Sequence, residues 1–259
     1  MNTPENNLQP GNGCDRAGKL FLVGLGPGGA LDRTLRAEAA IRQSDVVVGY
    51  HHYLESITDL TDGKELISSG MMQEVDRCRA AVERARSGAT VAFVSSGDAG
   101  VYGMAGLALE MIVAESVPVV VEVVAGISAA NSAASRMGAP LMLDYACISL
   151  SDLLVKWEQV RQRVEAVAAA DLVVALYNPK SHKRVHQIEE VAEIFRRHRP
   201  GNTPVGIATA VGTDEERIVM SDLDHFLGEP IGMRTIVIIG NRSSKCLNGW
   251  FLTPRGYKL

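Results

Sequence analysis

Residues 20–29, LFLVGLGPGG, decide the fold prediction. An apolar run predicts a buried strand, and the glycines Gly24, Gly26 and Gly29 end it with the spacing G-x-G-x-x-G. Glycines at this spacing let the chain turn tightly from a strand into a helix. In open α/β sheets, ligands bind beyond the carboxyl ends of such strands. The stretch therefore predicts the first strand of an α/β sheet, followed by a loop that is a candidate ligand site.

The same glycine pattern occurs in dinucleotide-binding proteins, but two nearby features argue against that ligand. Those proteins carry an acidic residue at the end of the next strand, about 20 residues on, to bind a ribose hydroxyl. Here the next predicted strand runs into Gly49 and Tyr50. Pro27 also removes one amide donor from the turn. A tight turn without a ligand explains the glycines as well, and an NAD-dependent oxidoreductase or a non-catalytic nucleotide-binding regulator stays an alternative.

Short apolar runs alternate with longer helix-like stretches along the chain. Strands are expected at residues 19–24, 45–49, 90–95, 118–124, 146–150, 171–177, 203–208 and 234–239. Helices are expected at residues 31–43, 73–87, 102–115, 127–138, 151–169 and 182–198. Ser151 and Asp152 are the expected N-cap residues of the fifth helix. This alternation predicts an α/β fold with much parallel strand pairing.

The segment MGAPLMLDYA, residues 137–146, interrupts the alternation near the middle of the chain. Gly138 and Pro140 are unfavourable inside a helix, so they mark a break. We expect two αβα domains with a ligand-binding cleft between them. The expected division is a flexible N-terminal tail over residues 1–18, an N-terminal α/β domain over 19–141 and a C-terminal α/β domain over 142–259.

Composition restricts the class of function. A formal net charge of −4 argues against a nucleic-acid-binding protein, which usually presents a basic surface. Cys14, Cys78, Cys147 and Cys246 lie far apart, and no His/Cys cluster has metal-ligand spacing, so neither a disulfide framework nor a metal site is expected. The first 18 residues lack the apolar segment of a signal peptide, and no apolar run has the length of a membrane span. We expect a cytoplasmic protein that binds neither nucleic acid nor membrane.

Five further loops with small or polar residues follow predicted strands. They are VSSGDAGVYG (94–103), VVAGISAANSAAS (123–135), VVALYNP (173–179), IATAVGTDEE (207–216) and TIVIIGNRS (235–243). Any one of them is often only a turn. With the first glycine loop they make six, drawn from both halves of the chain, and together they predict one ligand site between two domains.

At these residues the sequence resembles the tetrapyrrole (corrin/porphyrin) methylases. The resemblance covers residues 19–257 and is carried by VGLGPGG (23–29), SSGDAGVYGMAG (95–106), VVAGISAANSAASRMGAPL (123–141) and TPRGY (253–257). GYHHY (49–53), ISLSDLL (148–154) and LYNPKS (176–181) narrow it to the branch that methylates C17 of precorrin-3B or cobalt-precorrin-3, with ring contraction, in cobalamin biosynthesis. It implies S-adenosylmethionine bound between the two domains, and a homodimer.

The resemblance also implies which residues bind S-adenosylmethionine. They come from the glycine turn, the SGD loop, the start of the helix after Gly126 and three segments of the second domain: Pro27, Gly97, Asp98, Ala99, Val101, Ser128, Ala129, Tyr177, Asn178, Ala210, Val211 and Thr235. Small residues in the first domain's loops let the backbone approach a ligand closely. For Asp98, a turn that hydrogen-bonds its own backbone is an equally good interpretation.

A tetrapyrrole substrate carries several carboxylates, so cationic side chains are expected beside the cleft. The candidates are Arg33, Arg136, Lys180, His182, Lys183 and Arg184, although a charged run such as NPKSHKR is also typical of a solvated surface. For the proton movements of ring contraction, the candidates are Tyr50, His51 and His52, since histidine titrates near neutral pH. Solvent-facing residues at a helix start are the alternative there. A sister methylase that acts at another ring position also stays an alternative.

Overall fold

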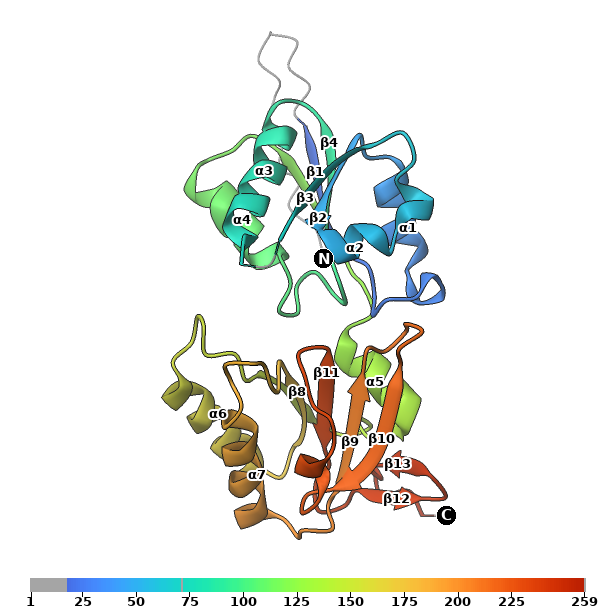
Figure 1. Cartoon of the computed structure of the whole chain (residues 1–259), viewed down its shortest axis with the longest axis vertical. Helices are drawn as coiled ribbons and strands as arrows, with labels where there is room; N and C mark the ends of the chain where they lie inside the picture. Colours follow the sequence, from blue (N-terminus) through green and yellow to red (C-terminus); the bar gives the residue numbers. More distant parts are fainter. Residues whose placement is uncertain (1–17, 71, 259) are drawn as a thin grey trace.

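The computed structural model describes residues 18–70 and 72–258, which form two α/β units (Figure 1). The expected N-terminal tail lies outside the described residues, apart from Gly18. The first unit is a parallel sheet in the order β3 (Glu65–Ser69), β2 (Val46–Tyr50), β4 (Thr90–Ser95), β1 (Lys19–Gly24) and β5 (Val120–Val124). Because these strands are parallel, the loops that follow them lie at one edge of the sheet.

Helices cover both faces of the first sheet, since its central strands are buried on both sides. One face packs against α1 (Leu35–Arg42) and α2 (His51–Glu55), and the other against α3 (Glu74–Arg86) and α4 (Ala105–Ala114). The loops also contain the short 3-10 helices η1 (Ala30–Asp32) and η2 (Thr58–Leu60). The helix expected from residue 31 begins at Leu35 because the hydroxyl of Thr34 accepts a hydrogen bond from the amide of Ala37 (3.0 Å) and caps it.

The second unit has a mixed sheet, which corrects the expectation of much parallel pairing in this half. Its strand order is β10 (Arg217–Asp222), β9 (Pro204–Thr209), β11 (Thr235–Ile239), β8 (Val173–Tyr177) and β7 (Tyr145–Ser149). Only β7 and β8 are parallel in this sheet; the other three pairings are antiparallel. The unpredicted strand β10 returns directly from β9 as a hairpin, so no crossover helix separates β9 from β11.

Helices cover the faces of the second sheet too. They are α5 (Ala129–Met137), α6 (Trp157–Ala169) and α7 (Gln187–His198), with the short 3-10 helix η3 (Phe226–Gly228). Near the C-terminus, β12 (Lys245–Leu247) and β13 (Trp250–Leu252) form a small separate sheet with β6 (Gly138–Ala139). The eight expected strands are all present, with ends shifted by at most two residues. The strands missed are β3, β6, β10, β12 and β13; β3 is largely exposed, β6, β12 and β13 are short, and β10 has no fully buried residue.

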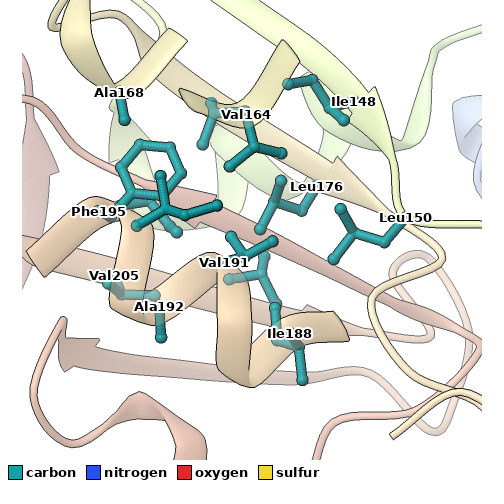
Figure 2. Packing of buried hydrophobic residues seen from close by; sticks show 14 of the residues in the cluster. Ile148, Leu150, Val164, Ala168, Leu176, Ile188, Val191, Ala192, Phe195 and Val205 are labelled. Atoms are coloured by element: carbon teal, nitrogen blue, oxygen red, sulfur yellow. The ribbon is translucent and has the colours of Figure 1, made fainter. Parts of the chain in front are cut away.

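The main core of the second unit lies between its sheet and the helices α6 and α7 (Figure 2). On α7 the buried residues Ile188, Val191, Ala192 and Phe195 follow the spacing of one helix face, which is why this segment folds as an amphipathic helix. They pack against Leu176 of β8 and its neighbours (Figure 2). Burial of each large apolar side chain contributes about 1.5–3 kcal/mol relative to leaving it exposed.

The expected N-cap at Ser151 or Asp152 is wrong, because α6 begins six residues later at Trp157. The carboxylate of Asp152 accepts a hydrogen bond from the side chain of Gln187 (3.0 Å), so it does not cap a helix. Residues 151–156 form a loop instead. The side chain of Trp157 then fixes the helix start by donating to Glu190 on α7 (2.7 Å).

The helix α5 precedes the expected domain boundary at residues 141/142, yet it packs against the second sheet. Ala130, Ala133 and Met137 share a buried cluster with Val173 and Ile238. Figure 1 shows the helix beside β9 and β10. We therefore propose that the boundary lies near the N-terminus of α5. In the part of the chain that the structure describes, no helix combines the length and apolar character needed to cross a bilayer.

Candidate functional site

The loops that follow β1, β4 and β5 contact one another through the backbone of glycine residues. Gly26 and Gly97 pair through two backbone hydrogen bonds, of 3.0 and 2.7 Å. A Cβ atom added to Gly126 would lie 2.2 Å from the carbonyl oxygen of Gly97 and 2.6 Å from that of Gly24. Such distances exclude any side chain, so these glycines permit backbone-to-backbone packing of the loops after β1, β4 and β5. The glycine pattern of residues 24–29 is thus explained by contacts within the protein, because a Cβ atom at Gly24, Gly26 or Gly29 would also lie within 2.7 Å of a backbone atom.

Asp98 holds the same loops together through its carboxylate. Its Oδ1 accepts from the amide of Gly100 (2.8 Å), which is the turn expected for this residue, and its Oδ2 accepts from the amide of Gly126 (3.0 Å). One carboxylate therefore ties the loop after β4 to the loop after β5. The neighbouring Ala99 is buried and Val101 is partly exposed.

The glycine loop of the first unit touches the second unit directly. A Cβ atom at Gly29 would lie 2.7 Å from the carbonyl oxygen of Gly212, and one at Gly28 would lie 2.7 Å from a methyl group of Thr213. Beside this contact, Pro27 lies close to the same loop, 3.3 Å from the Cβ position of Gly212. The loops after β1 and β9 thus pack against each other across the two units.

A chain of charges runs beside that contact. Arg136 on α5 pairs with Asp32 of the first unit (3.3 Å) and with Glu216 of the second (3.2 Å), and Glu216 also accepts from the amide of Gly212 (2.8 Å). The hydrogen bond from Gly212 and the nearby Arg136 hold the pKa of Glu216 below its usual range. Arg136 was expected to bind substrate, but its guanidinium is engaged in joining the two units.

Tyr102 forms a second connection between the units. Its hydroxyl accepts from the amide of Ser149 (3.1 Å) and donates to the carbonyl of Cys147 (3.0 Å). Its ring lies 5.0 Å from that of Tyr177, whose hydroxyl accepts from the amide of Ala130 at the start of α5 (3.0 Å). Burial raises the pKa of both tyrosines, so both hydroxyls keep their protons at neutral pH.

Two of the expected cofactor residues other than glycine have left-handed backbone conformations. Asn178 has φ 49° and Ala210 has φ 51°, and Tyr102 on the facing loop has φ 55°. Such conformations cost about 1–3 kcal/mol in a non-glycine residue and are typical of functional sites. The side chain of Asn178 donates to the hydroxyl of Ser149 (3.0 Å), which fixes it at the end of β8.

Antiparallel pairing brings Thr235 to this edge of the second sheet. Thr235 begins β11 and pairs with Thr209, the last residue of β9, with 2.9 Å between the two hydroxyl oxygens. Its hydroxyl also accepts from the amide of Gly232 (3.1 Å), and the residue is buried. Ser128 caps α5 by accepting from the amide of Asn131 (3.3 Å).

The expected cofactor residues therefore lie on loops that face one another across the two units. Most of the set has small or apolar side chains, and its buried members are Gly97, Ala99, Tyr177, Ala210, Val211 and Thr235. Small side chains let the backbone of these loops approach a ligand closely, and backbone amides and carbonyls can form hydrogen bonds with an adenine ring. These residues fit an adenosyl group.

Two of the expected substrate-binding arginines form ion pairs or hydrogen bonds with other groups of the protein. Arg33, with its side chain only 4% exposed, forms a two-pronged ion pair with Asp59 (2.8 and 3.0 Å), and this arginine lowers the pKa of that carboxyl. Arg184 is buried and donates to the carbonyl of Asn178 (2.9 Å). The remaining candidates lie in the same loop after β8: Lys180, His182 and Lys183. Within residues 18–70 and 72–258, these three form no ion pair, and His182 and Lys183 are exposed.

The candidate acid–base residues form an aromatic cluster at the end of β2. The ring of Tyr50 lies 4.2 Å from that of His51 and 5.2 Å from that of His52. His52 also pairs with Glu55 (2.9 Å), whereas His51 is partly buried between its neighbours. Since β2 neighbours β4 in the sheet, this cluster lies at the same edge as Asp98.

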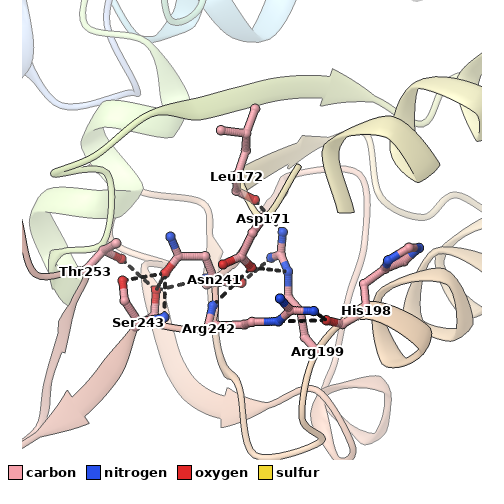
Figure 3. Close-up of polar contacts among 10 residues, drawn as sticks. Asp171, Leu172, His198, Arg199, Asn241, Arg242, Ser243 and Thr253 are labelled. Carbon is pink, nitrogen blue, oxygen red and sulfur yellow. Dashed lines mark hydrogen bonds and ion pairs between the residues drawn. The ribbon is translucent and has the colours of Figure 1, made fainter. Parts of the chain in front are cut away.

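The sixth expected loop, after β11, lies at the opposite edge of the second sheet. Because β11 runs antiparallel to β8, its end at Ile239 is turned away from the two-unit contact. Figure 3 shows that the residues that follow form a polar network: Asn241 accepts from Ser243 (2.9 Å), and Arg242 donates to the carbonyl of His198 (2.8 Å). A cavity of about 490 Å³ lies beside this network. This loop is therefore not part of the candidate site.

Sequence reasoning missed the residues that join the two units. Tyr102 lies within the loop 94–103 and Ser149 within the motif 148–154, but no local pattern indicates that they are partners. Asp32 and Glu216 are ordinary surface carboxylates in the sequence. Only the spatial meeting of the units gives these residues a role.

Comparison with known proteins identifies related chains. A model of the family Tetrapyrrole (Corrin/Porphyrin) Methylases matches residues 19–226. The cobalt-factor III methyltransferase of Priestia megaterium is 47% identical over 245 residues, which are 93% of this chain and 45% of that protein. The probable cobalt-factor III C(17)-methyltransferase of Salmonella typhimurium is 39% identical over 240 residues, covering 93% of this chain and 100% of that protein. The chain thus spans less than half of the first relative and all of the second.

The fold is also shared with a solved structure. That of the methyltransferase CobJ superimposes with a TM-score of 0.83 at 34% sequence identity. The match covers 91% of this chain and 98% of that one. Both α/β units, and the way they face each other, are therefore common to the two proteins.

Proposed function

Because the chain belongs to the tetrapyrrole (corrin/porphyrin) methylases, we propose that it is an S-adenosylmethionine-dependent C-methyltransferase of cobalamin biosynthesis. The proposed reaction is methylation of C17, with ring contraction, on a cobalt-bearing precursor such as cobalt-factor III or on the metal-free precorrin-3B. The names of the two relatives support the cobalt-bearing substrate. The observation that carries the proposal is the meeting of small-residue loops from both units, at residues that fit an adenosyl group.

Methyl transfer to carbon is an in-line displacement. The new bond joins C17 to the methyl carbon while the sulfur–methyl bond breaks, and S-adenosylhomocysteine is released. When bound, S-adenosylmethionine supplies an activated methyl group, so the chain must position the reactants and exclude water. Positioning alone can contribute about 7–11 kcal/mol. The close backbone contacts at Gly97 and Gly126 hold the loops after β1, β4 and β5 against one another, which supports such positioning.

On the substrate side, Lys180, His182 and Lys183 are the proposed partners of the precursor's carboxylates. Their loop follows β8 and so lies beside the cofactor residues Tyr177 and Asn178. Arg33, Arg136 and Arg184 are not proposed for this role, because each is engaged with protein groups. The side chains of the loop after β8 are therefore available to bind substrate, whereas the three arginines stabilise the protein around the site.

For ring contraction, we propose that His51 or His52, beside Tyr50, moves a proton. A neutral imidazole can both accept and donate near neutral pH. The test measures ring contraction in His51→Ala and His52→Ala by the absorption spectrum of the product. If both variants contract the ring as fast as the unaltered protein, this assignment is wrong.

Calorimetric titration tests the proposed function directly. S-adenosylhomocysteine should bind and NADH should not. The protein is then incubated with S-adenosylmethionine and, separately, cobalt-factor III or precorrin-3B, and the methylated carbon is located by NMR with a ¹³C-labelled methyl group. Methylation at another carbon would support a sister methylase, and binding of NADH alone would overturn the proposal. A homodimer and a cytoplasmic location stay predictions from the sequence.

A further inference from the structure

Two neighbouring leucines protrude from the loop between β7 and α6. Leu153 is 75% exposed and Leu154 is 99% exposed. Single exposed leucines are common, but an adjacent pair in the loop that follows the edge strand β7 is a candidate contact surface. The loop follows β7, whose end lies at the same edge as the candidate site because β7 and β8 are parallel.

The loop that carries these leucines is held in place at both ends. Leu150 before it is fully buried, and Val155 after it packs against the core of the second unit. Between them, Asp152 accepts a hydrogen bond from Gln187 (3.0 Å). The leucines are therefore presented to the outside by an anchored backbone.

A cavity of about 180 Å³ lies directly beneath the loop. Leu154, Val155 and Val160 form its apolar wall, and Tyr102 and Ser149, which join the two units, form another. Arg163 of α6 lines it as well. Within the described residues, Arg163 forms no ion pair, in contrast to Arg161 on the same helix, which pairs with Glu190 (3.6 Å).

The volume of the cavity and the guanidinium of Arg163 beside it indicate which chemical group it could bind. One water molecule occupies about 30 Å³ of liquid, so the cavity has room for about six non-hydrogen atoms. A propionate or acetate side chain has that size, with an apolar stem and a carboxylate that suits an arginine. The large apolar ring from which such side chains extend would then lie against the protruding leucines.

We propose that the 151–156 loop and Arg163 form a binding site for the edge of the tetrapyrrole substrate, and this inference rests on the proposed function. One carboxylate side chain of the macrocycle enters the cavity and pairs with Arg163. Leu153 and Leu154 cover the adjoining part of the ring. The site belongs to the second unit and adjoins the contact made by Tyr102.

The test compares Arg163→Met with Arg161→Met, and adds the double variant Leu153→Ser/Leu154→Ser. Equilibrium binding of cobalt-factor III is measured without methyl donor by absorption titration, and KM and kcat are measured where turnover occurs. We expect Arg163→Met to weaken macrocycle binding at least about tenfold, the equivalent of one charge-assisted hydrogen bond. The leucine variant should weaken it too, while Arg161→Met should not. Binding of S-adenosylhomocysteine should stay within about twofold in all three, because none of these side chains belongs to the residues proposed to bind that ligand.

The outcomes separate this inference from the proposed function. If the unaltered protein binds the macrocycle without methylating it, and Arg163→Met still weakens binding, the inference stands and the function fails. If the protein methylates cobalt-factor III but Arg163→Met binds it normally, the inference fails alone. Absence of macrocycle binding overturns both. A change in molecular mass of the leucine variant in sedimentation would also overturn the inference, by assigning the leucines to contact with a second copy of the chain.

Discussion

The hydroxyl of Tyr102 forms the hydrogen bonds with Ser149 and Cys147 that a neighbouring strand would otherwise form. Leu150 directs its amide inward to Tyr177 on β8, so the amide of Ser149 and the carbonyl of Cys147 lie on the free edge of β7. Tyr102 binds both groups with one oxygen, at 3.1 and 3.0 Å. A side chain of the first unit thus satisfies the exposed edge of a strand in the second.

Removal of this hydroxyl should weaken the contact between the units. Tyr102→Phe keeps the ring beside Tyr177 but loses both hydrogen bonds, which should cost about 1 kcal/mol because water partly replaces them. The expected fall in Tm is about 2–4 °C by calorimetry. Affinity for S-adenosylhomocysteine should fall several-fold, since Ala99 and Val101 lie on the same loop.

Tyr145→Phe is the matched control, because Tyr145 lies on β7 and its hydroxyl forms no hydrogen bond within the described residues. It should leave both Tm and affinity unchanged. Equal effects of the two substitutions would show that the hydroxyl of Tyr102 has no special role.

The packing around the glycine residues predicts opposite effects for two glycine-to-alanine changes. At Gly126 a Cβ atom would lie 2.2 Å from a backbone oxygen, so Gly126→Ala should destabilise the protein by more than about 3 kcal/mol or prevent folding. At Gly106, on α4, nothing lies within 4 Å of the added carbon. There alanine should stabilise by about 0.5–1 kcal/mol, through its higher helix propensity. Urea denaturation measures both, and a tolerated alanine at position 126 would contradict the described loop packing.

Glu216 predicts a contribution to stability that depends on pH. Its pKa is lowered from 4.5, first by the hydrogen bond from the amide of Gly212 and further by Arg136. A carboxyl with a lowered pKa in the folded state contributes stability that is complete above its unfolded value. That contribution is lost as the pH falls through the folded value. Stability should therefore decline below pH 4.5, and part of the decline belongs to this residue.

The measurement is urea denaturation of Glu216→Gln from pH 7 to about pH 3, against the unaltered protein. The variant should be less stable at neutral pH by at most about 1 kcal/mol, and the difference should shrink in acid. Glu193→Gln, at an exposed position on α7, serves as the control and should leave the profile unchanged. A difference for Glu216→Gln that is constant across pH would assign its effect to packing instead of charge.

The strand positions could be predicted because local patterns determine them. Apolar runs bounded by glycine and polar residues placed β1, β4 and β8 within two residues. The direction of β11 could not be predicted, since it depends on whether the chain returns by a hairpin or a helix. For that reason the expectation that the loop after Ile239 belongs to the site is wrong, whereas Thr235, at the other end of the strand, lies at the candidate edge.

For the candidate site, residue type was predictable but residue partnership was not. The glycine motif indicates that something approaches the backbone closely; only the fold shows that Gly26, Gly97 and Gly126 approach one another. Likewise the sequence shows the charge of Arg136 and Arg184, but not that Arg136 pairs with a carboxylate or that Arg184 donates to a backbone carbonyl. Such partners lie tens of residues away along the chain, beyond the reach of any local pattern.

Arg199 predicts a large loss of stability with little effect on catalysis. Its side chain is 0% exposed and lies over the ring of Phe195, 4.5 Å from the centroid. Its guanidinium donates to the carbonyls of Leu172 (2.6 Å) and Gly240 and lies 3.4 Å from Asp171 (Figure 3). Burial lowers the pKa of Arg199 to about 10, so it stays charged at neutral pH.

Arg199→Met should therefore destabilise the protein by about 3–5 kcal/mol, because it leaves the carbonyls of Leu172 and Gly240 without their donor and removes the ion pair with the partly exposed Asp171. Calorimetry should show a fall in Tm on the order of 10 °C. The neighbouring Arg197→Met removes only an exposed ion pair with Glu165 and should cost at most about 1 kcal/mol. Since Gly240 lies at the edge of the sheet opposite the candidate site, folded Arg199→Met should bind S-adenosylhomocysteine normally below its Tm. A variant that stays folded and stable but loses that affinity would show that the two edges of the sheet are coupled.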